Sequence, residues 1–460
     1  MRLAILPLGR PTFDVPFAEE KLTAMLAALD QSGHEIIGPR HLLFDAEQTQ
    51  SAMDEIAGQN PDQLLLLQVT FTDASMATVA AAKFNIPLSI WAVTEPRDGD
   101  RLRLNSFCGL NLASHALGLR NRTFSWLYCD PLKDCQSALE ELLSGSRTVR
   151  PLSAEKATVP GTQGASVMEA IKGQRIARLG DHPEGFDTCA YDPAELQNLA
   201  GVEVDALQLD ALFDPANAVT HEELQQTRQL AQSKLSELDQ VDQTELDKSL
   251  RLKNVLQNLR ADRNYAAFAI RCWPETFTEY GGAVCGPVSM MGEDRVPCAC
   301  EADVYGALTQ MILQEASQQP VFLADLVDMD IDDNTGVVWH CGQAPISMCD
   351  PDFKARATIH TNRKMPLLFE FPLKSGPVTL MRISQSFGET KMILSSGEML
   401  KREMAFTGTS GTVRFDRPVE QVLPDIMNSG LEHHMAVAYG DHRDILRSIA
   451  VAMDIPVLEI

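Results

Sequence analysis

The stretch DQLLLLQVTFTDASMATVAAAKFNIPLSIWAV, residues 62–93, decides the fold class. It opens with an unbroken apolar run, continues with an amphipathic helical pattern and closes with a second apolar run, PLSIWAV (87–93). Apolar strands that alternate with helices are typical of a parallel sheet covered by helices on both faces. The same alternation extends to three more apolar runs: RLAILPL (2–8), HEIIG (34–38) and FSWLYC (124–129). Residues 1–150 are therefore predicted to form a doubly wound α/β domain.

Two further units are expected after a polar linker at 144–164. Residues 151–318 repeat the alternation of strands and helices, with strands predicted at RIARLG (175–180), VEVDALQL (202–209) and YAAFAIRC (265–272). In residues 319–460 the apolar runs become short, partly alternating, and bounded by Gly, Pro, Asn and Asp, which favours antiparallel strands of a small barrel or sandwich. The predicted fold class is thus α/β: two doubly wound domains followed by a mostly antiparallel, barrel-like C-terminal domain.

Composition excludes several classes of partner. The chain has 460 residues, with 39 Lys and Arg against 63 Asp and Glu, for a formal net charge of −24. Such a surface repels phosphate backbones, so we expect neither nucleic acid nor an anionic membrane as a partner. The first apolar run is too short for a secretory signal, and no run reaches the length of a membrane span. Ten scattered cysteines fit reduced thiols in a cytoplasmic enzyme.

Acidic residues follow two predicted strands, and they are better candidates for a functional site than the cysteines beside them. Cys298 and Cys300 have no second pair at zinc-site spacing, so they are interpreted as small packing residues. Glu275 ends the apolar run AFAIRCWPE, and CACEADVYG (298–306) carries a carboxylate at each of its fourth and sixth positions. Ligands bind at the carboxyl ends of strands in α/β sheets, so these acids are candidates to converge on one cation. For Asp303 alone, the alternative is a helix N-cap.

Histidines supply the third kind of ligand. His340 ends the run TGVVWH, and His433 and His434 precede the apolar run MAVAY. A lone histidine is more often structural than a ligand. Two carboxylates and one imidazole, however, form an oxygen and nitrogen site that suits Mn²⁺ or Mg²⁺ better than zinc. Such an ion holds adjacent sugar oxygens while a carboxylate moves a proton between carbons.

Several motifs in fixed order resemble a known family. They are RCWPE (271–275), ACEADVYGAL (299–308), WHCG (339–342), HHMAVAYGDHRDILRSIAVAMDIPV (433–457), LGRPTFD (8–14) and IARLGDHPEGFD (176–187). Their order and spacing are similar to those of the L-fucose isomerase/L-arabinose isomerase superfamily, above all its shorter fucose-isomerase-like members. The resemblance spans nearly the whole chain.

The resemblance implies a site and an assembly. The metal, Mn²⁺ or alternatively Mg²⁺ or Co²⁺, would be held by Glu275, Asp303 and His434, and Glu279 is an alternative to Glu275. Glu275 and Asp303 would also transfer the proton. The residues expected to bind substrate are Arg10, Trp273, Glu301 and His340. A homo-oligomer, trimer or hexamer, is implied, with Arg10 and Asp14 in a segment that reaches a neighbouring subunit's site.

The implied activity is aldose–ketose isomerisation through a cis-enediol. The absence of a phosphate-cradling Gly-rich loop favours an unphosphorylated sugar, which includes deoxy and sulfonated sugars. For an anionic sugar, the candidate cationic partners are Arg10, Arg271, Arg363 and Lys364. The alternatives are another metal-dependent enzyme, such as a hydrolase, lyase or aldolase, and a non-catalytic sugar sensor on the same fold.

Overall fold

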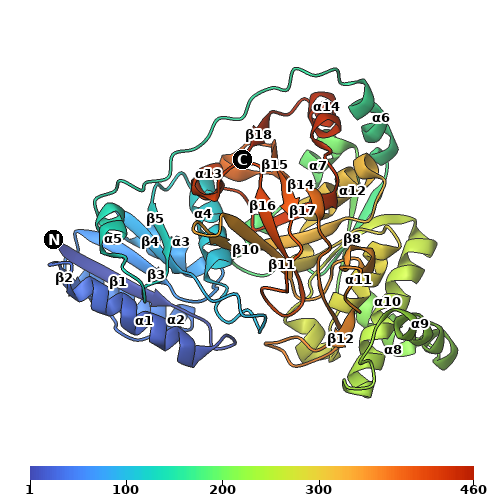
Figure 1. Cartoon of the computed structure of the whole chain (residues 1–460), viewed down its shortest axis with the longest axis horizontal. Coiled ribbons are helices and arrows are strands. Elements are labelled where there is room, and N and C mark those ends of the chain that lie inside the picture. Colours follow the sequence, from blue (N-terminus) through green and yellow to red (C-terminus); the bar gives the residue numbers. More distant parts are fainter.

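The computed structural model describes all of residues 1–460, which form three β-sheets with helices packed around them (Figure 1). The mixed α/β class is confirmed. No helix is both long enough and apolar enough to cross a membrane. The predicted boundaries near residues 150 and 318 each fall between two sheets.

The first sheet is parallel, with the strand order β2-β1-β3-β4-β5. Its strands are β1 (Arg2–Leu8), β2 (Glu35–Ile37), β3 (Gln63–Gln68), β4 (Leu88–Val93) and β5 (Ser125–Cys129). Its helices are α1 (Val15–Asp30), α2 (Ala46–Ala57), α3 (Ser75–Lys83), α4 (Ser106–Leu119) and α5 (Gln136–Leu143). Apolar residues of α1 and α5 pack on one face, and those of α2, α3 and α4 on the other. The stretch that decided the class forms β3, α3 and β4.

The chain then crosses the molecule without a helix or strand from residue 144 to 161, and Figure 1 shows this segment arching from α5 to α6. The second sheet is also parallel, in the order β7-β6-β8-β9. Its strands are β6 (Arg175–Leu179), β7 (Glu203–Leu207), β8 (Tyr265–Ile270) and β9 (Cys298–Ala299). The helices of this part are α6 (Thr162–Ile171), α7 (Pro193–Ala200), α8 (Asp210–Ala218), α9 (His221–Lys234), α10 (Gln243–Arg263), α11 (Cys285–Glu293) and α12 (Val304–Ser317).

The third sheet has nine strands, most of them paired antiparallel, although β13–β16 and β15–β18 are parallel pairs. The strands are β10 (Phe322–Asp330), β11 (Thr335–His340), β12 (Arg356–Thr358), β13 (Leu368–Pro372), β14 (Gly376–Ser384), β15 (Lys391–Met399), β16 (Thr409–Phe415), β17 (His434–Tyr439) and β18 (Val457–Glu459). Two helices accompany them, α13 (Val419–Ser429) and α14 (Arg443–Met453). Because β16 pairs with both β11 and β15, the pairings β16-β11-β10-β17-β14-β15 close a circuit.

The three sheets meet at one place. Helix α12 packs against β8 of the second sheet and against β14 and β17 of the third, while α4 of the first unit packs against β10. A core of 82 buried residues is continuous from the first sheet to the third. This packing brings the carboxyl ends of both parallel sheets against β10, β11 and β17.

Candidate active site

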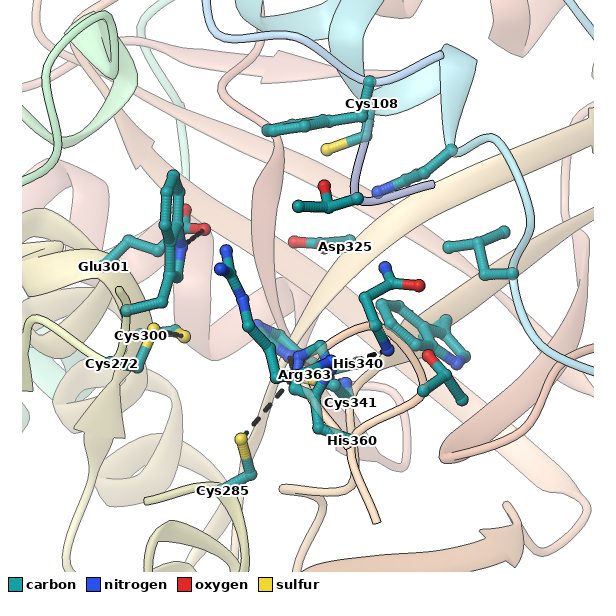
Figure 2. Close-up of a pocket in the computed structure, with 18 of the residues that line it drawn as sticks. Cys108, Cys272, Cys285, Cys300, Glu301, Asp325, His340, Cys341, His360 and Arg363 are labelled. Carbon is teal, nitrogen blue, oxygen red and sulfur yellow. Dashed lines mark hydrogen bonds between the residues drawn. The ribbon is translucent and has the colours of Figure 1, made fainter. Parts of the chain in front are cut away.

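A cavity lies at this junction, and its wall comes from all three sheets (Figure 2). Arg10 follows β1, Phe71 follows β3, Trp273 follows β8, and Glu301 follows β9. The third sheet contributes Asp325 from β10, His340 from β11, His433 just before β17, and residues 360–363 from the loop before β13. This is the edge where open α/β sheets bind ligands.

The four residues predicted to bind substrate all line the cavity: Arg10, Trp273, Glu301 and His340. Arg10 reaches it within its own chain, after donating its backbone N–H to Thr70 Oγ1 at 2.8 Å. Within the single chain, Arg10 therefore lines the same cavity as Glu301 and Asp325.

Glu301 presents its carboxylate to the cavity through an unusual backbone. Its φ of 57° lies in the left-handed region, between β9 and α12. Trp273 donates its indole N–H to one carboxylate oxygen at 2.9 Å, and His433 Nε2 lies 2.8 Å from the other. Burial alone raises the pKa of Glu301, but the hydrogen bond and charge of His433 outweigh it and lower the pKa to about 2. Glu301 is thus a carboxylate fixed in its ionised form.

Asp303 lies two residues further on and is enclosed instead. It is the N-cap of α12 and accepts the N–H of Gly306 at 2.7 Å. Its oxygens also accept from Arg382, at 2.5 and 3.0 Å, and lie 2.9 Å from His434 Nδ1. Burial raises the pKa of Asp303, yet the Arg382 charge and the bonds from His434 and Arg382 hold it well below its usual range. Asp303 does not line the cavity, and no oxygen is left to meet a substrate there.

Three buried polar atoms near His434 have no partner within the protein. They are Nε2 of His434, Oδ1 of Asp325 and Nε2 of His340. These atoms lie within 4.8 Å of one another, and His434 Nε2 is 3.3 Å from Asp325 Oδ1. Unpaired polar atoms are costly in a protein interior, so three that converge indicate a ligand or an ion between them. Glu301 Oε2, at 3.9 Å from His434 Nε2, borders the same space.

The donor set fits a divalent ion of the Mn²⁺ or Mg²⁺ type at two of these atoms. Asp303 fixes Nδ1–H of His434 and leaves Nε2 free, which is the carboxylate–histidine arrangement common behind metal ligands. Adjacent ligands of an ion at about 2.1 Å are about 3 Å apart, close to the separation between His434 and Asp325. His340 fits less well, because its Nδ1 accepts the N–H of Cys341 at 2.9 Å and the ring hydrogen then sits on Nε2.

The structure does not bring Glu275 or Glu279 to these groups. Arg271 lies four residues before Glu275 and donates its Nε–H to the Glu275 carboxylate at 2.6 Å. Glu275 does not line the cavity, although its neighbour Trp273 does. Glu279 is exposed on the following turn of π-helix. Of the three ligands that the resemblance implied, only Asp303 and His434 are in contact with each other, and Asp303 stands behind His434.

The cysteines are closer to the cavity than their interpretation as packing residues implies. Cys298 is buried in β9, but Cys272, Cys285, Cys300 and Cys341 all line the cavity. Cys272 faces Cys300, and Cys285 faces Cys341 (Figure 2). The neighbouring thiol and burial both raise the pKa of Cys300 far above its ordinary value, so Cys300 meets the cavity as a neutral thiol.

Sequence reasoning missed two groups of the site. Asp325 lies within the apolar run VFLADLVD (321–328), where an acid inside a buried strand is the only available signal. Arg382, fully buried in β14, holds Asp303, and its sole sequence signal is a cation within the apolar run TLMRIS. The partners of Asp325 and Arg382 come from distant parts of the chain, which meet only when the sheet has formed.

Comparison with known proteins places the chain in a family. Family models match residues 4–153 as the fucose/sulfoquinovose isomerase N-terminal domain and residues 338–460 as the L-fucose isomerase C-terminal domain. A sulfoquinovose isomerase of Priestia aryabhattai is 30% identical over 95% of this chain and 94% of its own length. The sulfoquinovose isomerase of Alkalicoccus urumqiensis is 30% identical over 99% of this chain and 98% of its own.

A third relative, from Clostridium sp. (strain MSTE9), has the same name, with 28% identity over 98% of this chain and 97% of its own length. The expected fucose-isomerase-like membership is confirmed at nearly full length. The chain belongs to the fucose/sulfoquinovose isomerase family of aldose–ketose isomerases.

Proposed function

We propose that the protein interconverts the aldose and ketose forms of a sulfonated hexose of the sulfoquinovose type. The observation that carries the proposal is that Glu301, Asp325 and His340 line one cavity together with two guanidinium groups, while His434 lies directly beside Asp325 and His340. The names of the relatives supply the sulfonated substrate class. The reaction needs a base and groups that hold the two adjacent oxygens of the sugar, and the cavity offers both kinds of group.

Glu301 is the base of the proposal. Its carboxylate faces the cavity and is held at both oxygens, by Trp273 and by His433. A fixed carboxylate next to C1 and C2 of an open-chain sugar removes the proton from C2 and returns it to C1, which passes through a cis-enediol. Holding the base in one orientation limits the transfer to one face of the sugar.

His340 and His434 serve the oxygens in this mechanism. His340 presents Nε2–H, because Nδ1 is occupied by the Cys341 N–H, and so donates to a sugar oxygen on which charge develops. His434 presents the lone pair of Nε2, because Asp303 holds its other nitrogen. Asp303 is therefore a positioning residue, which acts through His434.

Asp325 and His434 are the residues that would hold a divalent cation, Mn²⁺ or alternatively Mg²⁺ or Co²⁺. When bound, such an ion polarises the carbonyl and the adjacent hydroxyl of the open-chain sugar and offsets the negative charge of the enediol. Both residues are buried and have unpartnered atoms facing each other, which supports this assignment.

The test is to incubate the protein with sulfoquinovose and Mn²⁺ in D₂O and to follow the products by NMR. We expect the corresponding ketose, with deuterium at the carbon that exchanged its proton. Cleavage of the carbon chain would make the protein a lyase or aldolase, and tight binding without any product would make it a sensor. Calorimetry with Mn²⁺ tests the ion separately: Asp325→Asn should weaken binding at least tenfold, whereas Glu301→Gln should leave it near the wild-type value.

The homo-oligomer, trimer or hexamer, that the resemblance implies is part of the same proposal. Light scattering coupled to size-exclusion chromatography tests it directly. A monomer that retains full turnover would remove the need for shared sites, in keeping with Arg10 reaching the cavity of its own chain.

A further inference from the structure

Two guanidinium groups line the cavity, but only one of them has a counter-ion. Arg10 forms an ion pair with Asp73. Arg363, on the loop between β12 and β13, makes no ion pair and no side-chain hydrogen bond. The other two cations considered for an anionic sugar are elsewhere: Arg271 pairs with Glu275, and Lys364 is exposed outside the cavity.

The surroundings of Arg363 make its lack of a partner notable. Its guanidinium carbon lies 5.3 Å from the centre of the Trp273 ring and 5.7 Å from that of Phe277. Burial lowers the pKa of Arg363, and the nearby Arg10 charge adds to this effect. The aromatic faces attract the guanidinium, but its half-buried charge has no anion to offset the loss of hydration. In the view of Figure 2, the side chain extends into the cavity between Glu301 and Asp325.

The loop is built to hold this side chain in place. His360 Nδ1 accepts the backbone N–H groups of both Asn362 and Arg363, at 3.2 and 3.3 Å. The His360 ring in turn packs against Phe277, with ring centres 5.3 Å apart. Thr361 and Asn362 also line the cavity, which places neutral hydrogen-bonding groups beside the guanidinium.

We propose that Arg363 is the anion-binding residue of the site and that it takes a monoanionic, three-oxygen group such as a sulfonate. The inference rests on the proposed function, whose substrate class it explains at the level of a residue. A guanidinium offers paired N–H donors in a fixed fork that matches two oxygens of such a group. Trp273 joins the two parts of the cavity, because its N–H contacts Glu301 while its ring carries Arg363.

Charge decides between a sulfonate and a phosphate. The cavity wall near Trp273 has one unpaired positive charge, since Asp73 neutralises Arg10. Burial and the Arg363 charge lower the pKa of His360 to about 3, so that ring adds no charge at neutral pH. One positive charge matches a sulfonate, which is a monoanion, whereas a phosphate monoester at pH 7 carries about −1.5 to −2. The protein as a whole, at −24, repels anions, so recognition depends on this local cation.

The test uses alditols, which bind but have no carbonyl group to isomerise. Calorimetry on the full-length protein compares 6-deoxy-6-sulfoglucitol, 6-deoxyglucitol and glucitol 6-phosphate. We expect Arg363→Met to weaken binding of the sulfonated alditol about 100-fold and that of 6-deoxyglucitol by less than threefold. Arg363→Lys, which keeps the charge and loses the fork, should fall between them. Lys364→Met removes an adjacent charge outside the cavity and should change nothing, which makes it the matched control.

The results bear on three claims: the role of Arg363, the preference for a monoanion, and the proposed function. Equal losses for the sulfonated and the uncharged alditol, or no loss for either, would overturn the role of Arg363. Tighter binding of the phosphorylated alditol would overturn the preference for a monoanion. Sulfoquinovose that is not isomerised by the wild-type protein, together with Arg363-dependent binding of the sulfonated alditol, would reject the proposed function and leave the anion site standing. Turnover of sulfoquinovose by Arg363→Met at the wild-type rate would support the proposed function and overturn the role of Arg363.

Discussion

Glu301 and Asp303 are two residues apart, yet they occupy opposite environments. Glu301 lines the cavity and is held by His433 and Trp273, whereas Asp303 is fully buried and spends every acceptor site on Gly306, Arg382 and His434. Both Glu301 and Ala302 have a positive φ, near 57° and 55°, and this turn sends the two carboxylates to different sides of the chain.

Within one short motif, Glu301 is placed to react and Asp303 is placed to support the structure. The Glu301 carboxylate lines the cavity, and the Asp303 carboxylate fixes the imidazole of His434, which lies beside Asp325. Substitutions at the two positions should therefore differ in kind: one should affect turnover alone, and the other should affect folding as well.

The largest expected effect is on turnover, from Glu301→Gln. The amide keeps the size of the side chain and can still accept from Trp273, but it cannot take a proton from C2. We expect kcat to fall about 10³-fold while the melting temperature stays within a few degrees of the wild-type value. Steady-state kinetics on the proposed sugar and a thermal melt give the two numbers. A variant with near-normal kcat would remove Glu301 from the mechanism.

The next effect, on stability, is expected from Asp303→Asn. Asparagine still caps α12, but the buried Arg382 loses its closest counter-ion and keeps only Glu432, 3.9 Å from its Nε. Breaking a buried pair from one side costs about 3–5 kcal/mol, which urea denaturation detects. The double variant Asp303→Asn/Arg382→Met should recover part of this loss.

A surface pair provides the control for that measurement. Asp352 pairs with Lys401 where both side chains are mostly exposed, so Asp352→Asn should leave stability unchanged. If Asp303→Asn were equally silent, the contrast between a buried architectural carboxylate and an accessible reactive one would fail.

A third carboxylate, Glu95, extends the comparison to an acid without a cationic partner. Burial raises the pKa of Glu95 to about 8, although the N–H groups of Leu104 and Asn105 oppose the rise. Its ordinary value is 4.5, so between pH 4.5 and 8 the folded state binds a proton that the unfolded state has lost. Stability should therefore fall as pH rises through that window, by about 2 kcal/mol after a discount for partial exposure.

Glu95→Gln is the variant that isolates this effect. It removes the titrating group and keeps an acceptor for the Leu104 N–H, so its stability should be flatter with pH than that of the wild-type protein across the window. Urea denaturation at pH 5, 6.5 and 8 measures the slope. Parallel curves for the two proteins would show that Glu95 is not the group responsible.

The sequence predicted the strands that carry the site better than it predicted the partners of the side chains in the site. The alternating pattern at 62–93 was sufficient for the first sheet, because a buried parallel strand requires a continuous apolar run. Arg10, Trp273, Glu301 and His340, which the resemblance implied as substrate-binding residues, all line the cavity, and their role in binding stays a prediction. The alternative of an N-cap for Asp303 was correct.

The misses share a physical cause, which is that spacing along the chain does not fix the direction of a side chain. Glu275 comes five residues after the end of β8, and Arg271, four residues before it, holds its carboxylate. Asp325 was hidden because the pairing of β10 with β17 brings it opposite His434, a contact between residues more than 100 positions apart. Arg363 stands on an irregular loop, where no periodic pattern predicts which cation faces inward.

The smallest effect is expected from Trp273→Phe, which tests whether the indole serves Glu301 or Arg363. Trp273→Phe removes the N–H that reaches Glu301 at 2.9 Å but keeps an aromatic face for Arg10 and Arg363. The loss of one hydrogen bond to a charged group, while His433 still holds the other oxygen, should lower kcat about tenfold and leave KM for a sulfonated sugar nearly constant. A rise in KM with kcat unchanged would mean that the indole serves the anion through Arg363 rather than the base. Since Trp273 is the one side chain that contacts both Glu301 and Arg363, this division between kcat and KM reports whether the reacting end of the cavity and its cationic wall act independently.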